Sequence, residues 1–195
     1  MKKSIGIILF LSTLALSSCN NTDQSIENAD SVLEMATDDT AVVYRNDAIW
    51  ENVDFEAPVL NEPDLQGSDV TLRGTDSVTI YQVGQDIMFD TDKAQIRLAG
   101  EEKLQKVAEN IKKRTNGQAK IRVFGFTDSR AGKDYNLELG KERAKAVEDW
   151  LTNQGGFDAS RIEVISKGQQ EPVATNETAA GRQQNRRVEI VVVKS

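Results

Sequence analysis

Between residues 85 and 194 the hydrophobic pattern switches repeatedly between the period of a helix and the period of a strand. This alternation constrains the fold more than any other feature of the chain. Apolar residues recur at helical spacing over 98–114 and 133–153, and an Asn-Gly or Gly-Gly pair follows each stretch as a stop signal. Residues 178–184 predict a further short helix. Four runs are typical of strands: 85–90, 120–126, 161–167 and 188–193.

The order of these elements predicts an α/β (α+β) domain with the succession β-α-β-α-β-(α)-β, in which helices pack against one mixed sheet. Residues 76–195 are expected to make up this domain, a length that suffices for an independent hydrophobic core. The last run, 188–193, is apolar on both faces and is therefore expected to be a central strand.

The residue types that the chain lacks exclude several classes of function. There is no histidine, which excludes histidine-based acid–base catalysis, Ser-His-Asp triads and His-ligated metal sites. A single cysteine excludes an internal disulfide and a cysteine cluster for zinc or iron–sulfur. The formal net charge of −7 argues against nucleic acid as a partner. We therefore expect neither a metal nor another cofactor.

The first 19 residues carry the features of an export signal. Two lysines follow the initial methionine, and the apolar stretch 5–16 is too short to span a membrane. Leu-Ser-Ser-Cys ends the segment, which resembles a bacterial lipoprotein signal peptide over residues 1–18. The resemblance implies lipidation of Cys19, a multi-chain anchor that holds a protein stably on a membrane. Asn20 then implies the outer membrane; an ordinary signal peptide with a coincidental cysteine is the alternative.

Residues 19–75 are expected to form an acidic, extended spacer. They hold thirteen Asp or Glu and two Arg, and such a charge excess with few apolar residues favours a solvated chain. The main apolar exceptions are Trp50, Phe55, Val59 and Leu60. Two interpretations stay open for them: they fold back onto the following domain, or they form a segment that binds a partner.

Three stretches of the domain resemble the OmpA-like peptidoglycan-binding family, which includes outer-membrane porins, the Pal lipoproteins and flagellar stator proteins. The first is IMFDTDKA at 87–94, and the second is VFGFTDSRAG at 123–132, followed by YNLELGKERA at 135–144. The third is ATNET at 174–178, followed by GR and by NRRVE at 185–189. They stand in the family's order and spacing over roughly residues 85–194. Together with the signal segment, the layout is similar to that of a Pal-type lipoprotein.

The resemblance implies non-catalytic binding of the meso-diaminopimelate side chain of peptidoglycan. Because the free end of that ligand carries one ammonium and one carboxylate, its site needs an acid and a base. Asp128 matches the family's aspartate and would pair with the ammonium, whereas Arg143 matches the family's arginine and would bind the carboxylate bidentately. The spacing of Asn136, Leu139 and Arg143 places them on one side of a helix. The other positions assigned to the pocket are Thr127, Asp90, Thr91 and Arg187.

The chain departs from the family pattern at two positions. Phe126 stands where the family usually has histidine, so packing is expected to replace a polar contact there. Gly140 stands where serine is usual, and a glycine inside a helix costs about 1 kcal/mol relative to alanine. Arg186 and Arg187 have a second interpretation, as charges at a sheet edge that oppose aggregation.

The expected function is that of an outer-membrane lipoprotein whose domain faces the periplasm and ties the membrane to peptidoglycan. An envelope assembly protein that holds another envelope protein through Trp50 and Phe55 is the first alternative. A peptidoglycan-acting enzyme is the second, and its chemistry would depend on carboxylates. Asp128 and Asp134 are candidates for that chemistry only because they lie near each other in the sequence.

Overall fold

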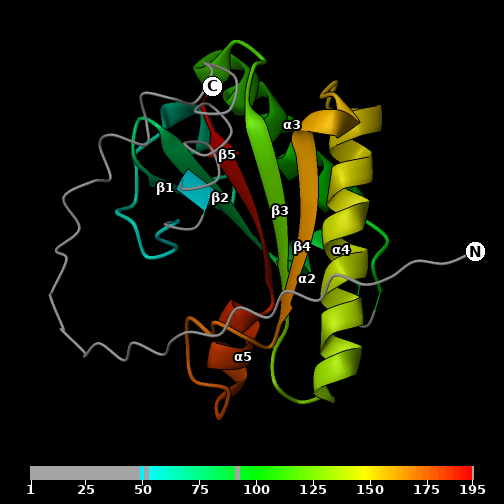
Figure 1. Ribbon diagram of the computed structural model, residues 1–195. Helices are drawn as coiled ribbons and strands as arrows, with labels where there is room; N and C mark the ends of the chain where they lie inside the picture. Colours follow the sequence, from blue (N-terminus) through cyan, green and yellow to red (C-terminus); the bar gives the residue numbers. More distant parts are fainter. Residues whose placement is uncertain (1–48, 51–52, 91–92, 195) are drawn as a thin grey trace, which may run out of the picture. The chain divides into compact units, whose positions relative to one another are not determined.

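The computed structural model describes residues 49–50, 53–90 and 93–194 (Figure 1). Its strands form one mixed sheet in the spatial order β1-β2-β5-β3-β4, which confirms the predicted fold class. They are β1 (Val70–Gly74), β2 (Val78–Gly84), β3 (Lys120–Phe126), β4 (Ile162–Gly168) and β5 (Arg187–Val193). β3 and β4 run parallel, and the other neighbouring pairs are antiparallel. The apolar β5 lies at the centre, as expected.

The helices and turns outside the strands are η1 (Pro63–Leu65), α2 (Gln85–Met88), α3 (Leu98–Thr115), α4 (Lys133–Asn153), η2 (Ala159–Arg161) and α5 (Ala179–Asn185). The bounds of α3, α4 and α5 lie within one residue of those that the sequence predicts. α3 ends because Asn116 adopts a left-handed conformation with φ of 51°. Thr178 caps the N-terminus of α5, where its hydroxyl accepts a hydrogen bond from the Gly181 N–H at 3.0 Å.

The main core lies between one face of the sheet and the helices α3 and α4. The apolar stripe of α3, with Leu104 and Ile111, and that of α4, with Val147 and Leu151, are fully buried there. They meet inward-facing strand residues, among them Ile121, Val123, Ile190 and Val192. This burial is what fixes α4, the helix that carries most of the candidate site, against β3 and β4.

Residues that precede position 76, among them Trp50 and Phe55, cover the opposite face of the sheet. The Phe55 ring lies edge-on to the rings of Phe124 and Phe126, with centroid distances of 5.2 and 6.0 Å. The Arg122 guanidinium lies 4.4 Å from the centre of the Trp50 ring. Trp50 and Phe55 therefore fold back onto the domain. Both side chains are half-buried in this position.

The predicted strand at 85–90 is wrong. Residues 85–88 form α2, and only Phe89 is extended, in an isolated bridge with Ile96. The strand that feeds the sheet is β2, immediately before it, which pairs with the central β5 along its whole length. Gly84, at the end of β2, marks the change from strand to helix, and α2 turns the Gln85 side chain into the interior.

The ordered domain also begins before residue 76. β1 pairs with β2, and the chain ahead of it runs along the outer edge of β1. The Leu60 N–H donates to the Leu72 carbonyl at 2.8 Å, and the Gly74 N–H donates to the Pro58 carbonyl at 3.1 Å. Residues 53–75 therefore contribute a strand and an edge to the sheet instead of an extended spacer.

Some acidic residues of this segment form ion pairs with basic residues of α3, although the Asp64 side chain is still 51% exposed. Asp64 pairs with Lys113 at 2.6 Å, and Glu62 pairs with Arg114 at 3.1 Å. The signal segment 1–18, Cys19 and the spacer up to residue 48 lie outside the described residues. Within the described ranges, no helix has the length and hydrophobicity needed to cross a membrane.

Candidate functional site

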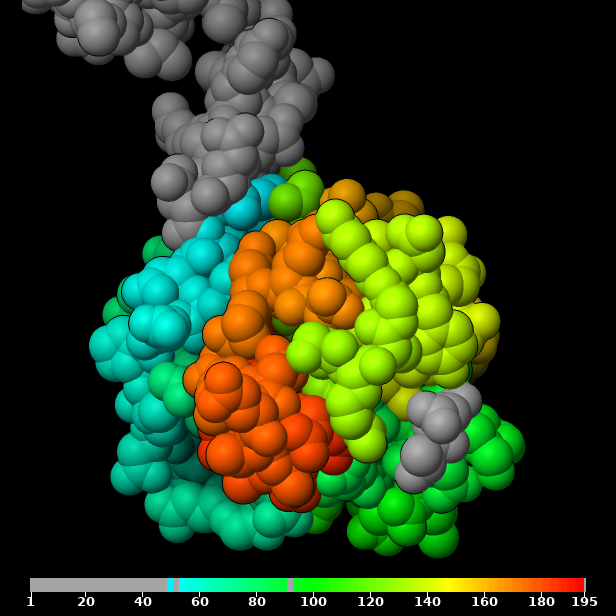
Figure 2. Space-filling view, turned by 90° about the horizontal axis from the view of Figure 1, so that it is seen from below, coloured from blue at the N-terminus to red at the C-terminus, as the bar shows by residue number. Residues whose placement is uncertain are grey.

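A pocket of about 300 Å³ opens at the end of the sheet where β3 leads into α4. β3 stops at Phe126 and α4 starts at Lys133, so the loop between them delivers its side chains to this edge. Figure 2 views this end of the molecule, where the start of α4 (yellow-green) lies beside α5 and the loop before it (orange to red). The lining residues are Gln85, Asp86, Thr127, Asp128, Arg130, Ala131, Tyr135, Asn136, Leu139, Arg143 and Arg186.

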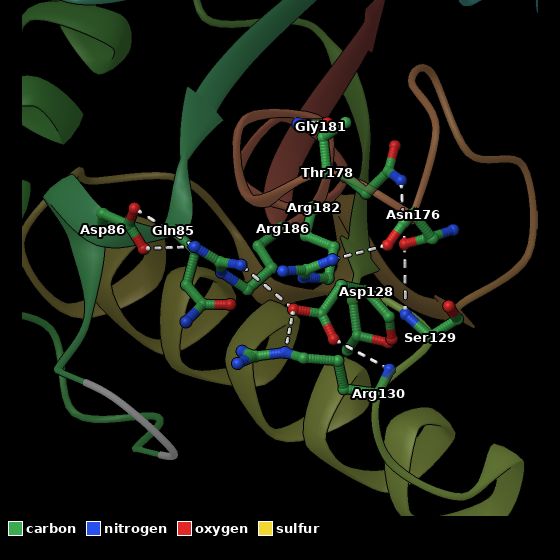
Figure 3. Close-up of polar contacts among 12 residues, drawn as sticks. Gln85, Asp86, Asp128, Ser129, Arg130, Asn176, Thr178, Gly181, Arg182 and Arg186 are labelled. Atoms are coloured by element: carbon green, nitrogen blue, oxygen red, sulfur yellow. Dashed lines mark hydrogen bonds and ion pairs between the residues drawn. The ribbon is translucent and has the colours of Figure 1, made fainter.

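Asp128 lies in this pocket and is only 5% exposed. Its Oδ1 accepts the backbone N–H of Arg130 at 3.0 Å, and its Oδ2 lies 3.0 Å from both Arg130 Nε and Arg186 Nη1 (Figure 3). Burial raises the pKa of the Asp128 carboxyl, but these hydrogen bonds together outweigh it and leave the pKa below its ordinary value of 3.8. Asp128 is therefore an anion at neutral pH, the state that an ammonium ligand requires.

Arg143 lies in the same pocket on α4 and is 2% exposed. Its Nη1 donates to the Gln85 side-chain oxygen at 2.6 Å, and its Nε donates to the Lys93 carbonyl at 3.1 Å. The guanidinium also lies 5.6 Å from the centre of the Phe89 ring. These contacts come from α2 and the segment after it, so the helix at 85–88 serves to orient Arg143.

The remaining predicted residues of α4 and the loop also line the pocket, but two of them hold the loop together. The Asn136 side-chain amide donates to the Asp128 carbonyl at 3.0 Å and to Gln169 Oε1 at 2.8 Å. The Thr127 hydroxyl donates to the Asp128 carbonyl at 3.1 Å. Leu139 supplies apolar lining. Thr127 and Asn136 thus position the backbone of Asp128.

Two of the predicted residues that the structure describes are not brought into the pocket. Asp90 lies outside its lining and forms ion pairs with Lys93 at 3.4 Å and Arg97 at 3.6 Å. Thr91 lies outside the described residues. Arg187 is buried on the other face of the sheet, 2.6 Å from Glu189 and 3.7 Å from the centre of the Phe126 ring.

The pocket arginine of the NRR triplet is Arg186 and not Arg187. Arg186 Nη1 donates to Asp128, and its Nη2 lies 3.4 Å from the carboxylate of Asp86 (Figure 3). Both arginines flank or begin β5, which is the central strand, so the sheet-edge interpretation is wrong. The side-chain alternation of a strand explains the exchange, because neighbouring residues at its start point to opposite sides.

The third motif supports the loop of Asp128 from behind. The Asn176 side-chain oxygen accepts the Ser129 N–H at 3.2 Å, and Arg182 donates to the Asn176 carbonyl at 2.7 Å (Figure 3). Asn185 Oδ1 accepts the backbone N–H of Val173 at 2.9 Å. This motif therefore acts by positioning the loop, a role that its spacing alone does not reveal.

The two departures from the family pattern have structural explanations. Phe126 is not among the residues that line the pocket, because it points to the opposite face, where it packs between Arg187 and Phe55. Gly140 permits the close approach of α4 to β3: a Cβ there would lie 2.8 Å from the Gly125 carbonyl oxygen. Among the described residues, no group of acidic or cysteine side chains is arranged to hold a metal ion.

Comparison with known proteins shows which family this domain resembles. The model of the OmpA family matches residues 88–186. The Probable lipoprotein YiaD of Escherichia coli is 36% identical over 128 residues, which cover 66% of this chain and 57% of that protein. The Peptidoglycan-associated lipoprotein of Agrobacterium fabrum is 37% identical over 128 residues, which cover 66% of this chain and 71% of that protein.

A solved structure extends the similarity to three dimensions. The cell wall anchor of the T6SS from Pseudomonas aeruginosa is 31% identical and has a TM-score of 0.60, over 68% of this chain and 92% of that chain. The chain spans little more than half the length of the first curated relative, with 57% of it matched. The similarity therefore concerns the domain that holds the pocket.

Proposed function

Because this chain belongs to the OmpA family, we propose that it binds peptidoglycan, without catalysis, through the diaminopimelate residue of the stem peptide. The observation that carries the proposal is that Asp128 and Arg143, one acid and one base, line a single pocket and are both buried. A relative is named Peptidoglycan-associated lipoprotein, and a structural neighbour is described as a cell wall anchor.

The pocket suits a zwitterionic amino-acid head. The ionised Asp128 offers its carboxylate to an ammonium, and its loop is held by Asn136 and Arg186. Arg143 is oriented by Gln85 and the Lys93 carbonyl, and its planar guanidinium matches a carboxylate. In partly desolvated surroundings, both charges recognise the ligand more strongly than they would on an open surface.

We further propose that the domain faces the periplasm and that a lipid on Cys19 ties it to the outer membrane. Two relatives carry the word lipoprotein in their names. Since no described helix could span a membrane, replacing Cys19 with alanine should move the full-length chain from the membrane pellet to the soluble fraction. A mutant that stays in the pellet would contradict the lipid anchor.

The binding itself is tested by a pull-down of the purified full-length chain with sacculi that contain diaminopimelate. Asp128→Ala or Arg143→Ala leaves a ligand charge unpaired, so binding should fall about 30-fold or more. Arg143→Lys should also lose most of its binding to sacculi, because an ammonium cannot reproduce the planar pair of donors of a guanidinium. Arg161→Ala, which removes a charge at the opposite end of β4, is the matched control.

The same experiment decides between binding and catalysis. Muropeptides of the sacculi should be unchanged after incubation with the chain. New cleavage products would favour an enzyme instead. Full binding by Asp128→Ala and Arg143→Ala, with the control also unchanged, would show that the protein attaches to sacculi elsewhere.

A further inference from the structure

Arg130 lies at the mouth of the pocket, where a simple diaminopimelate clamp has no role for it. It lines the pocket, and its side chain is 64% exposed. Its Nε donates to Asp128 Oδ2 at 3.0 Å, so a guanidinium lies beside the carboxylate that the ligand ammonium would approach (Figure 3). A bound ammonium and this guanidinium would compete for the same oxygen.

Asp128 does not need the Arg130 side chain to keep its orientation. Its Oδ1 is held by the backbone N–H of Arg130, which any residue at this position would supply. Its Oδ2 is held by Arg186, whose other nitrogen faces Asp86. Arg186 is 19% exposed and fixed between two carboxylates, whereas Arg130 reaches Asp128 from solvent. The Arg130 guanidinium is therefore the exchangeable partner of the two.

We propose that Arg130 changes partners when a stem peptide binds: it leaves Asp128 to the ligand ammonium and pairs with a second carboxylate of the ligand. This inference rests on the proposed function. In a stem peptide, diaminopimelate follows a D-glutamyl residue linked through its side chain, whose α-carboxylate lies one residue from the zwitterionic head. Arg130 thereby becomes a specificity residue that distinguishes a free α-carboxylate from its amide.

The surroundings of Arg130 suit a second anionic group. Ala131 and the exposed Tyr135 line the same pocket near the start of α4, where the helix dipole favours negative charge. Arginine matches a carboxylate in shape as well as in charge. Because Arg130 is exposed, the new pair adds only a modest preference, of the size measured for surface ion pairs.

The test compares two probes by calorimetry on the full-length chain: L-Ala-γ-D-Glu-meso-diaminopimelate and the same peptide with its D-Glu α-carboxylate amidated. The unsubstituted chain should prefer the free carboxylate by about fivefold, and Arg130→Ala should bind the two peptides within about twofold of each other. Arg161→Ala should keep the preference. Circular dichroism should show that Arg130→Ala is folded, because the lost side chain is exposed.

The outcomes separate this inference from the proposed function. Equal affinity of the unsubstituted chain for both peptides, or a preference that survives Arg130→Ala, would overturn the exchange of partners while leaving the clamp intact. If Arg143→Ala no longer binds either peptide, both peptides occupy the proposed site. If neither peptide binds the unsubstituted chain, the proposed function fails, and the inference fails with it.

Discussion

Asp128 is expected to make the stability of the domain depend on pH in a defined direction. Although burial raises its pKa, the hydrogen bonds from the Arg130 backbone, Arg186 and the Arg130 side chain leave the pKa below 3.8. A carboxyl with a depressed folded-state pKa stabilises the fold above its unfolded-state pKa, and this contribution is lost as the pH falls through the folded-state pKa.

Replacing Asp128 with asparagine should therefore lower the free energy of unfolding by about 1 kcal/mol at neutral pH and much less at about pH 2. Thermal unfolding of the full-length chain, followed by circular dichroism at both pH values, measures the difference. Glu138→Gln removes an exposed carboxylate of α4 and is the control. An equal loss of stability at both pH values would contradict the role of the ionised group.

At the scale of single residues, five of the seven proposed ligand-site residues that the structure describes line the pocket, as the sequence predicts. Those five follow from one strand end and one helix face, whose geometry a motif fixes. The prediction that Arg187 lines the pocket is wrong, because a shift of one residue at the start of β5 turns a side chain to the other face of the sheet. The pattern over 85–90 predicts a strand and therefore does not indicate that Gln85 and Asp86 line the pocket.

At the scale of elements, the contact between α4 and β3 is the feature on which the site depends. The helix backbone at Gly140 lies against the strand backbone at Gly125, so closely that a Cβ at Gly125 would lie 1.9 Å from the Gly140 carbonyl oxygen. α4 carries Asn136, Leu139 and Arg143. The spacing between Asp128 on the loop and Arg143 on the helix therefore follows from how closely these two elements approach.

Gly140→Ala should destabilise the domain, although alanine is ordinarily about 1 kcal/mol better than glycine inside a helix. The new Cβ would lie 2.6 Å from Ser166 Oγ and 2.8 Å from the Gly125 carbonyl, and a backbone oxygen cannot move aside cheaply. We expect a loss of about 1–3 kcal/mol, the usual cost of overpacking. Urea unfolding measures it, and peptide affinity should fall as α4 shifts.

The control is Lys141→Ala, one residue further along the same helix and exposed. It should change the free energy of unfolding by less than about 0.5 kcal/mol. A Gly140→Ala chain as stable as the original would show that α4 can relax away from β3, and the pocket geometry would then not depend on this contact.

Strongly periodic elements were predictable, whereas those that depend on distant partners were not. β3 and α4 have the predicted bounds, because their apolar residues recur regularly against one core. β1 and β2 were not predicted. β1 follows an acidic stretch, and it is stabilised by pairing with β2 and by the chain at 58–60, contacts that no local pattern contains.

At the scale of the whole molecule, the segment before residue 76 completes the domain on three sides. Phe55 covers the far face of the sheet, residues 58–60 line the edge of β1, and Leu65 enters the main core. The negative charge that indicated a solvated spacer is complementary to the lysines and arginine of α3. Composition alone does not distinguish a solvated charge from a paired one, and for this reason the expected boundary lay too late.

A chain cut at residue 76 should therefore fail to fold cooperatively, whereas residues 47–195 should unfold in a single transition. The shorter chain loses β1, the covering aromatic residues and the two buried leucines Leu65 and Leu72, which are 4% and 2% exposed. It also leaves the β2 edge and the phenylalanines of β3 open to water, a state that favours aggregation. Size-exclusion chromatography and urea unfolding compare the two chains.

A point substitution keeps this prediction testable when the shorter chain cannot be purified. In the full-length chain, Leu72→Ala should cost about 2–5 kcal/mol, because it opens a cavity between β1 and the core. Val59→Ala, in the same segment but 61% exposed, should cost less than about 0.5 kcal/mol. If Leu72→Ala proved as mild as Val59→Ala, and residues 76–195 melted like 47–195, β1 would be an appendage. The independently folded unit would then begin at β2, and the residues before Val78 would belong to the spacer, as their composition predicts.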